Sequence, residues 1–237
     1  MEALAERLTY STDYTETENS PQSLEDALVI IRNQQQVIEQ LTEQLRYDEL
    51  SGLLTKAAWH EDVDQRIEKD KPFGIFVLDL NNFKQINDDF SHHQGDILIE
   101  KFGNLLNERF RRETDQLAFI SHDEDSIFRS RIGGDEFAIT IDLSDNARRG
   151  DNIHARMDQV YEYIEQIWDE FIAQQDPEFE EKGLGLAIGP AIWSPHNPVD
   201  ATTLYRQADE AMYESKPLTE EEALEEARML GSAALQE

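Results

Sequence analysis

The sequence predicts an α+β fold, in which helices pack around a central sheet of mixed or antiparallel strands. Residues 73–80 read Phe-Gly-Ile-Phe-Val-Leu-Asp-Leu, an apolar run typical of a central strand buried on both faces. Two strand-like runs, 126–129 and 137–141, lie either side of a glycine pair, which indicates a hairpin with a two-residue turn at positive φ. Helical and strand-like segments do not alternate regularly, so a doubly wound fold is not expected.

The first 47 residues contain a polar segment followed by one long helix. Residues 1–22 are rich in Thr, Ser and Glu and lack a helical or strand period, so we expect a mobile tail. Residues 23–47 are expected to form a helix with apolar residues at every seventh position, which predicts a coiled-coil-like helix and parallel dimerisation. A helix packed on its own domain is the alternative. The seam consists of Leu24, Ile31, Ile38 and Leu45, with a second row of Ala27, Gln34 and Leu41.

Helices are predicted on both sides of the central strand. Thr55 is expected to cap a helix that runs to about Lys69. A second helix is expected from Asn82 or Phe83, directly after the strand. Asp96 is then expected to cap a third helix with a strongly apolar face.

The second half of the chain is predicted to contain, besides the hairpin, a helix, a strand and a final helix. The two helices are expected at 153–173 and 201–215, and the strand at 183–193. Residues 218–237 are expected to form an acidic helical tail. A palm-like or ferredoxin-like arrangement is a simple fold that accommodates this order of helices and strands. Loops are expected at 111–125, 142–151 and 174–182.

The composition excludes several classes of site and partner. The chain of 237 residues has no Cys, which excludes disulfides, thiolate metal sites and a Cys nucleophile. It has no apolar run of about 18 residues and no secretory signal pattern, so we expect no membrane span and a cytoplasmic location. With 51 acidic and 21 basic residues the net charge is −30, which disfavours nucleic acid and anionic lipid as partners. A nucleotide site would therefore need a metal ion and well-placed Lys side chains.

Two acidic stretches lie where strands are expected to end. Asp79 falls at the carboxyl end of the central strand, and Asp135 and Glu136 follow the glycine pair. If the strand lies beside the hairpin, Asp79, Asp135 and the Leu80 carbonyl form a hard oxygen site suited to Mg²⁺ or Mn²⁺. Such a site can support nucleotidyl transfer. Taken alone, acids beside a turn more often mark a solvated turn.

Phosphate binding is expected beside this pair of acids. The turn after Asp79 enters a helix, so its free N–H groups can cradle phosphate oxygens. Lys84 and Lys216 can neutralise the remaining negative charge of the phosphates. Each Lys taken singly is more often an ordinary surface residue.

Five motifs in order resemble the GGDEF family of diguanylate cyclases and cover roughly residues 46–216. They are Asp48-x-Leu-Ser-Gly-Leu, Asp79-x-Asn-x-Phe-Lys-x-Ile-Asn-Asp, His92-x-x-Gly-Asp96, Arg131-x-Gly-Gly-Asp-Glu-Phe and Ala208-Asp-x-Ala-Met-Tyr-x-x-Lys216. The resemblance implies a palm-like nucleotidyl cyclase fold over 48–217. It also implies Mg²⁺-dependent condensation of two GTP into cyclic di-GMP, with release of two pyrophosphates, by a homodimer holding one GTP per protomer.

The resemblance also assigns roles to individual residues. Asp79, the Leu80 carbonyl and Asp135 match the metal ligands. Asp135 is implied to help deprotonate the attacking 3′-hydroxyl, with Glu136 as a supporting acid. The other matches are Asn87 and Asp96 for guanine, Asn82, Phe83, Lys84 and Lys216 for phosphate, and Arg131 as a brace of the hairpin.

Regulation and departures from the family pattern leave other functions open. Arg112 and Asp115 have the pattern of the product-inhibition site but lie farther upstream than usual. Glu220 stands where the family often has a phosphate-binding Arg, and an acid there would repel a triphosphate. One alternative is therefore a weak or inactive domain that binds GTP or cyclic di-GMP, and another is a different palm-type nucleotidyl transferase. The input is expected to come from an upstream signalling protein or from dimerisation through 24–45.

Overall fold

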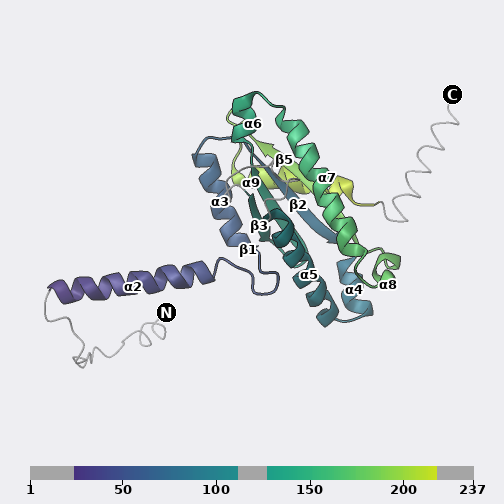
Figure 1. Cartoon of the computed structure of the whole chain (residues 1–237), viewed down its shortest axis with the longest axis horizontal. Helices are drawn as coiled ribbons and strands as arrows, with labels where there is room; N and C mark the ends of the chain where they lie inside the picture. The colour runs from purple at the N-terminus through teal and green to yellow at the C-terminus, as the bar shows by residue number, and fades with distance from the viewer. Residues whose placement is uncertain (1–23, 112–126, 218–237) are drawn as a thin grey trace, which may run out of the picture. The chain divides into compact units, whose positions relative to one another are not determined.

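The computed structural model describes residues 24–111 and 127–217 (Figure 1). The predictions for 1–22, 218–237 and most of the 111–125 loop lie outside these residues, as do Arg112, Asp115 and Glu220. The chain divides into two compact units, residues 1–44 and 45–237, which are described separately.

The described part of the first unit is helix α2, Leu24–Gln44. The helix ends three residues before the predicted limit. Residues 46–48 instead pair with the turn that follows, because Thr55 N–H donates to the Arg46 carbonyl and Asp48 N–H donates to the Leu53 carbonyl. Leu24, Ile31 and Ile38 of the predicted seam are 79%, 56% and 62% exposed, so the chain by itself leaves these apolar side chains in solvent.

The second unit is built on a five-stranded sheet in the order β1-β3-β4-β2-β5. Only β1 and β3 are parallel, and every other neighbouring pair is antiparallel. This mixed sheet with helices on both faces confirms the predicted α+β, palm-like fold. The strands are β1 Leu54–Thr55, β2 Phe73–Asn81, β3 Ile127–Arg131, β4 Glu136–Asp142 and β5 Gly185–Trp193.

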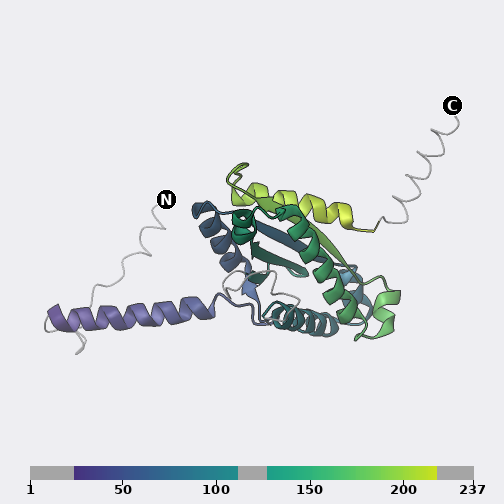
Figure 2. The ribbon, with the colours of Figure 1, turned by 45° about the horizontal axis from the view of Figure 1, so that its top comes forward.

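Helices cover both faces of this sheet (Figure 2). One core joins the sheet to α3, Lys56–Glu68, and α9, Ala201–Ser215. The other core joins it to α4, α5 and α7. The limits of the remaining helices are α4 Phe83–Asp89, α5 His92–Arg111, α6 Ser144–Arg149, α7 Ile153–Ile172 and α8 Pro177–Glu181.

Alternation along β2 explains why both cores form. Ile75 and Val77 lie in the core with α3 and α9, whereas Phe76 and Leu78 lie in the core with α5 and α7. Asp79 has the same parity as Val77, so it belongs to the α9 face. The strand is buried on both faces as predicted, and it is the element from which the site is built.

Three local predictions were wrong, the first of them the glycine turn of the hairpin. β3 ends at Arg131 and β4 begins at Glu136, and neither Gly133 nor Gly134 has a positive φ. The turn is wider because the Ile132 and Gly133 N–H groups both donate to the Glu136 carbonyl. Ile132 is 3% exposed, so it belongs to the core rather than to a solvated turn.

The other two wrong predictions concern helix starts and loops. Asp96 does not cap α5, because the helix begins at His92 and the Gln94 N–H donates to the Ser91 hydroxyl one turn earlier. The predicted loops at 142–151 and 174–182 contain the short helices α6 and α8. Helices of this length show too few turns for an apolar period to be visible in the sequence.

Within the described part of the chain, every helix is too short or too polar to span a lipid bilayer.

Candidate active site

Strand pairing brings three carboxylates to one end of the sheet. In the antiparallel register of β2 and β4, Asp79 lies directly opposite Glu136. The Leu80 N–H donates to the backbone carbonyl of Asp135 at 3.2 Å, which fixes the signature turn against the end of β2. The structure therefore brings Asp79 together with Asp135 and Glu136, which lie far from it in the sequence.

The charges of these acids oppose one another. Burial, followed by the charge of Asp79, raises the pKa of Asp135. Burial and the charges of Asp79 and Asp135 also raise the pKa of Glu136. Like charges on facing strand positions are unfavourable, so this end of the sheet favours a bound cation.

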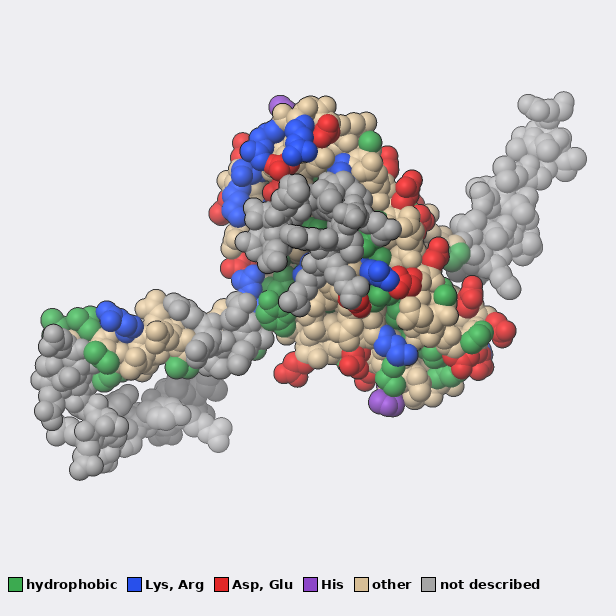
Figure 3. Space-filling model, in the orientation of Figure 1, with side chains coloured by type: hydrophobic (Ala, Val, Ile, Leu, Met, Phe, Trp, Pro, Cys, Tyr) green, Lys and Arg blue, Asp and Glu red, His purple; other side chains and the backbone are tan. Residues whose placement is uncertain are grey.

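Lys216 already supplies one cation. Its Nζ lies 2.8 Å from Oδ1 of Asp79, whose side chain is only 13% exposed. Lys216 follows the last residue of α9, so that helix carries the positive charge to the acids. Acidic side chains are spread over the visible face of the globular unit, and basic ones gather near α6 (Figure 3). A local Lys at the carboxylates is therefore what a polyphosphate ligand would require.

These oxygen donors suit Mg²⁺ or Mn²⁺, whose remaining ligands come from water or phosphate. They do not suit a metal ion that is held by side chains alone. Two carboxylates, of Asp79 and Asp135, and the Leu80 carbonyl are hard oxygen ligands. Among the described residues, no cluster of three or more His, Asp or Glu side chains is arranged to hold a metal ion. Mg²⁺ commonly keeps water and phosphate oxygens as ligands, so such an incomplete protein set suits a metal that arrives with a nucleotide.

The residues expected to contact phosphate lie in the turn from β2 into α4. Asn82 adopts a left-handed conformation with φ 59°, and its side-chain Nδ2 donates to the Gly183 carbonyl at 2.9 Å. Phe83 is half-buried and Lys84 is exposed. This turn begins directly after Asn81, the last residue of β2, so it lies close to Asp79.

The residues expected to read guanine lie on neighbouring helices. Asn87 is on α4, and Asp96 is exposed near the start of α5. A Cβ built on Gly95 would lie 2.0 Å from the Asn87 Oδ1, so the Asn87 amide lies directly over the residue that precedes Asp96. Glycine at position 95 therefore allows α4 to bring the Asn87 amide close to the start of α5.

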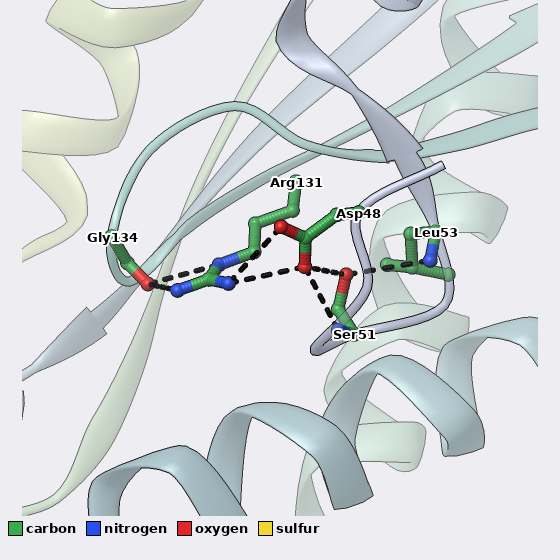
Figure 4. A network of polar contacts seen from close by, with 5 residues as sticks. All are labelled: Asp48, Ser51, Leu53, Arg131 and Gly134. Atoms are coloured by element: carbon green, nitrogen blue, oxygen red, sulfur yellow. Dashed lines mark hydrogen bonds and ion pairs between the residues drawn. The ribbon is translucent and has the colours of Figure 1, made fainter. Parts of the chain in front are cut away.

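A polar network holds the signature turn to the segment that follows α2 (Figure 4). Arg131 donates from Nε and Nη2 to the Gly134 carbonyl, at 3.1 and 2.7 Å. Its Nη1 lies 3.1 Å from Oδ1 of Asp48, which also accepts from the Ser51 N–H and hydroxyl. Arg131 therefore braces the turn, as the resemblance implied, and Asp48 anchors Arg131.

Comparison with known proteins identifies the family of this chain. A family model described as "Diguanylate cyclase, GGDEF domain" matches residues 45–222, well over half of the chain. The chain belongs to the GGDEF domain family. This family includes proteins named diguanylate cyclases, among which are the relatives below.

Two curated relatives illustrate how far the GGDEF similarity extends. Diguanylate cyclase DgcS of Shewanella oneidensis is 29% identical over 182 residues, which cover 75% of this chain and 52% of that protein. Probable diguanylate cyclase DgcT of Escherichia coli is 27% identical over 146 residues, which cover 61% of this chain and 27% of that protein. The chain thus spans about half or less of the length of these relatives.

A solved GGDEF structure shows the same fold. The coiled coil and GGDEF domain of DgcB from Caulobacter crescentus, solved in complex with c-di-GMP, superposes with a TM-score of 0.57. The two chains are 20% identical, and the match covers 80% of this chain and 90% of that one.

Sequence reasoning missed two contacts of this GGDEF site. The motif that contains Asp48 does not indicate that its carboxylate contacts Arg131, and Gly183 was predicted only as part of a strand. A signal existed for Gly183, since a glycine after an acidic helical turn is typical of a helix end. It was overlooked because α8 was predicted as a loop.

The Asp48 network leads to a prediction about pH. Burial alone would raise the pKa of Asp48, but hydrogen bonds from Ser51 and Arg131 and the Arg131 charge hold it below its ordinary value. A lowered pKa in the folded state adds stability above the unfolded pKa, and this stability is lost as pH falls through the folded value. Asp48→Asn should therefore lower the unfolding temperature at pH 7, with the difference shrinking below about pH 4.

Thermal unfolding of both proteins between pH 7 and pH 3.5 measures this difference. A suitable control is Glu210→Gln, because Glu210 forms an exposed ion pair with Arg206 on α9 and should have little effect. An Asp48→Asn protein with wild-type unfolding temperature at every pH would show that the network does not stabilise the domain.

Proposed function

We propose that the chain is a Mg²⁺-dependent diguanylate cyclase that converts two GTP into cyclic di-GMP and two pyrophosphates. The observation that carries the proposal is the meeting of Asp79 with Asp135 and Glu136 across β2 and β4, with Lys216 paired to Asp79. Mn²⁺ would suit the same oxygen donors. The GGDEF match over residues 45–222 supports the same reaction class.

Each residue of the site has a proposed role in holding one GTP. Asp79, Asp135 and the Leu80 carbonyl hold the divalent ion, which when bound neutralises charge that develops on the transferred phosphate. Asn87 and Asp96 hydrogen-bond the guanine edge as amide and carboxylate. Asn82, Phe83, Lys84 and Lys216 contact the phosphates.

The reaction requires two such sites facing each other. The 3′-hydroxyl oxygen of one GTP attacks the α-phosphorus of the other, and the bond to the β-phosphate oxygen breaks as pyrophosphate leaves. Asp135 accepts the hydroxyl proton, and Glu136 supports it electrostatically. The step then repeats in the opposite direction, so two phosphodiester bonds form and two pyrophosphates are released.

Dimerisation is proposed to occur through residues 24–45. The exposed apolar residues of α2, Leu24, Ile31 and Ile38, have the spacing of a parallel coiled coil. Burying such a seam between two chains would bring two half-sites within reach of each other. An upstream signalling protein that changes this helix pairing would then control the rate.

The proposed division of the chain follows from these roles. Residues 23–47 transmit the signal and residues 48–217 catalyse, between the polar segment 1–22 and the acidic segment 218–237. Arg112 and Asp115 are proposed as a product-inhibition site on their sequence pattern alone. A cytoplasmic location suits the use of GTP.

One observation favours a second function. Glu220 places an acid where the family often has a phosphate-binding Arg, which weakens triphosphate binding. The chain would then bind GTP or cyclic di-GMP without turning over. The remaining hypothesis is that the chain is a different palm-type nucleotidyl transferase.

Analysis of the reaction products distinguishes these three hypotheses about function. Purified protein is incubated with GTP and Mg²⁺, and the products are identified by chromatography and mass. Cyclic di-GMP with pyrophosphate is the expected result. Bound but unchanged GTP would support the binding function, whereas a different nucleotide product would support the other transferase.

A further inference from the structure

The segment around α8 contacts both helices that carry the proposed guanine-binding residues. It lies beside α4 in both views (Figure 1, Figure 2). We call residues 175–183 the α8 brace. We propose that the α8 brace positions α4 and α5 for nucleotide binding, and thereby sets the affinity of the site for GTP. This inference rests on the proposed function.

The brace holds α4 at its N-terminal end through Gly183. The Asn82 Nδ2 donates to the Gly183 carbonyl at 2.9 Å, across 101 residues of sequence. Gly183 has φ +78°, and a Cβ built there would lie 2.7 Å from that same Nδ2. Glycine suits this backbone conformation, and a larger residue would also push the Asn82 amide away from the Gly183 carbonyl.

The brace holds α4 at its C-terminal end through two further contacts. The Lys182 Nζ lies 2.8 Å from Oδ2 of Asp89, the last residue of α4. The rings of Phe90 and Phe179 meet edge to face with centroids 4.9 Å apart, and Phe179 is 7% exposed. Both ends of a seven-residue helix are therefore attached to one short segment.

The same segment contacts α5. The Lys101 Nζ donates to the Gln175 Oε1 at 3.0 Å, and the Gln175 Nε2 donates to the Phe171 carbonyl at the end of α7. Asn87 lies on α4 and Asp96 on α5, so the brace contacts both helices of the proposed guanine pair. α4 is too short to be stable by itself, which makes its position dependent on these contacts.

Three variants test the brace, together with one control. Lys182→Ala removes the ion pair and should weaken binding of α,β-methylene GTP, which cannot release pyrophosphate, about threefold. Gly183→Ala strains the backbone at its positive φ and displaces the Asn82 amide, and should weaken binding about tenfold. Exchanging the charges with Lys182→Asp and Asp89→Lys should restore binding to within about twofold of wild type. Arg148→Ala breaks an exposed ion pair with Asp145 on α6 and should change nothing.

Kinetics distinguish positioning from a general loss of structure. Lys182→Ala and Gly183→Ala should each raise KM for GTP by about the factor by which they weaken binding. The kcat at saturating GTP should change less than about twofold. Hydrogen exchange of the amides in residues 83–90 should be faster in Lys182→Ala than in wild type, which reports the brace even if Gly183→Ala folds poorly. Unfolding temperatures of Lys182→Ala and Arg148→Ala should be similar.

Failure of this inference differs from failure of the proposed function. If wild type binds GTP and Lys182→Ala and Gly183→Ala bind it equally well, the brace has no role in affinity. A fall in kcat with an unchanged KM also contradicts it. If wild type does not bind GTP at all, the proposed function and this inference are both overturned.

Discussion

Replacing Asp135 with asparagine is expected to reduce cyclic di-GMP formation at least about a hundredfold, because it removes a proposed metal ligand and proton acceptor worth several kcal/mol. Asn keeps the shape of the side chain and one oxygen, so the turn itself should persist. The backbone carbonyl that accepts from Leu80 N–H is unchanged by the substitution. The rate of product formation with GTP and Mg²⁺ measures the effect.

The same variant should not be less stable than wild type without metal. Because burial and Asp79 raise the pKa of Asp135, its ionised form opposes folding as pH rises through that pKa. Asp135→Asn should therefore unfold at a higher temperature than wild type at pH 7.5, and the gain should vanish as pH approaches about 4. Mg²⁺ should raise the unfolding temperature of wild type more than that of the variant.

Asp158→Asn provides the matched control. Asp158 is exposed on α7, which packs on the opposite face of the sheet from α9, and its substitution changes the net charge by the same amount. It should leave both turnover and the response to Mg²⁺ unchanged. Full activity in Asp135→Asn would show that the carboxylate has no part in the reaction.

Gly189→Ala is expected to destabilise the fold by about 3 kcal/mol, because it overpacks the contact between β5 and α9. A Cβ at this position would lie 1.9 Å from the Ala208 carbonyl oxygen and 2.4 Å from the Met212 N. Both are backbone atoms of α9, so no side-chain rotation relieves the clash. The unfolding temperature should fall by about 10 °C in a thermal scan.

Activity should fall with stability in this variant. Displacing α9 moves Lys216, which follows that helix and pairs with Asp79 at 2.8 Å. Gly134→Ala is the control for stability, since a Cβ there meets no atom within 4 Å and the residue has no positive φ. Equal unfolding temperatures for Gly189→Ala and wild type would mean that α9 does not pack closely on β5.

The long elements were predictable from sequence because their apolar patterns are extended. The run from Phe73 identified β2, and the periodic apolar residues of the helices predicted at 153–173 and 201–215 identified α7 and α9. Short helices and the signature turn were not predicted correctly. The turn depends on the burial of Ile132 in the core, a tertiary contact that overrides the local preference of a glycine pair.

The candidate site was predictable where its residues end strands, and unpredictable where they depend on distant segments. Asp79 and Asp135 stand at the expected ends of β2 and the hairpin, so their meeting followed from pairing those two elements. The contact of Asn82 with Gly183 joins residues 101 positions apart, and no local sequence pattern predicts that these two residues meet. Contacts of this kind arise only from the three-dimensional packing of α4 against α8.

The most direct measurement is the rate of cyclic di-GMP formation per protomer over a dilution series with GTP and Mg²⁺, for wild type and Asp135→Asn side by side. We predict that wild type forms cyclic di-GMP and pyrophosphate, that its rate per protomer rises with protein concentration, and that Asp135→Asn forms both at least about a hundredfold more slowly. The absence of product from wild type at every concentration, with GTP still bound, would contradict the proposal and support a nucleotide-binding function.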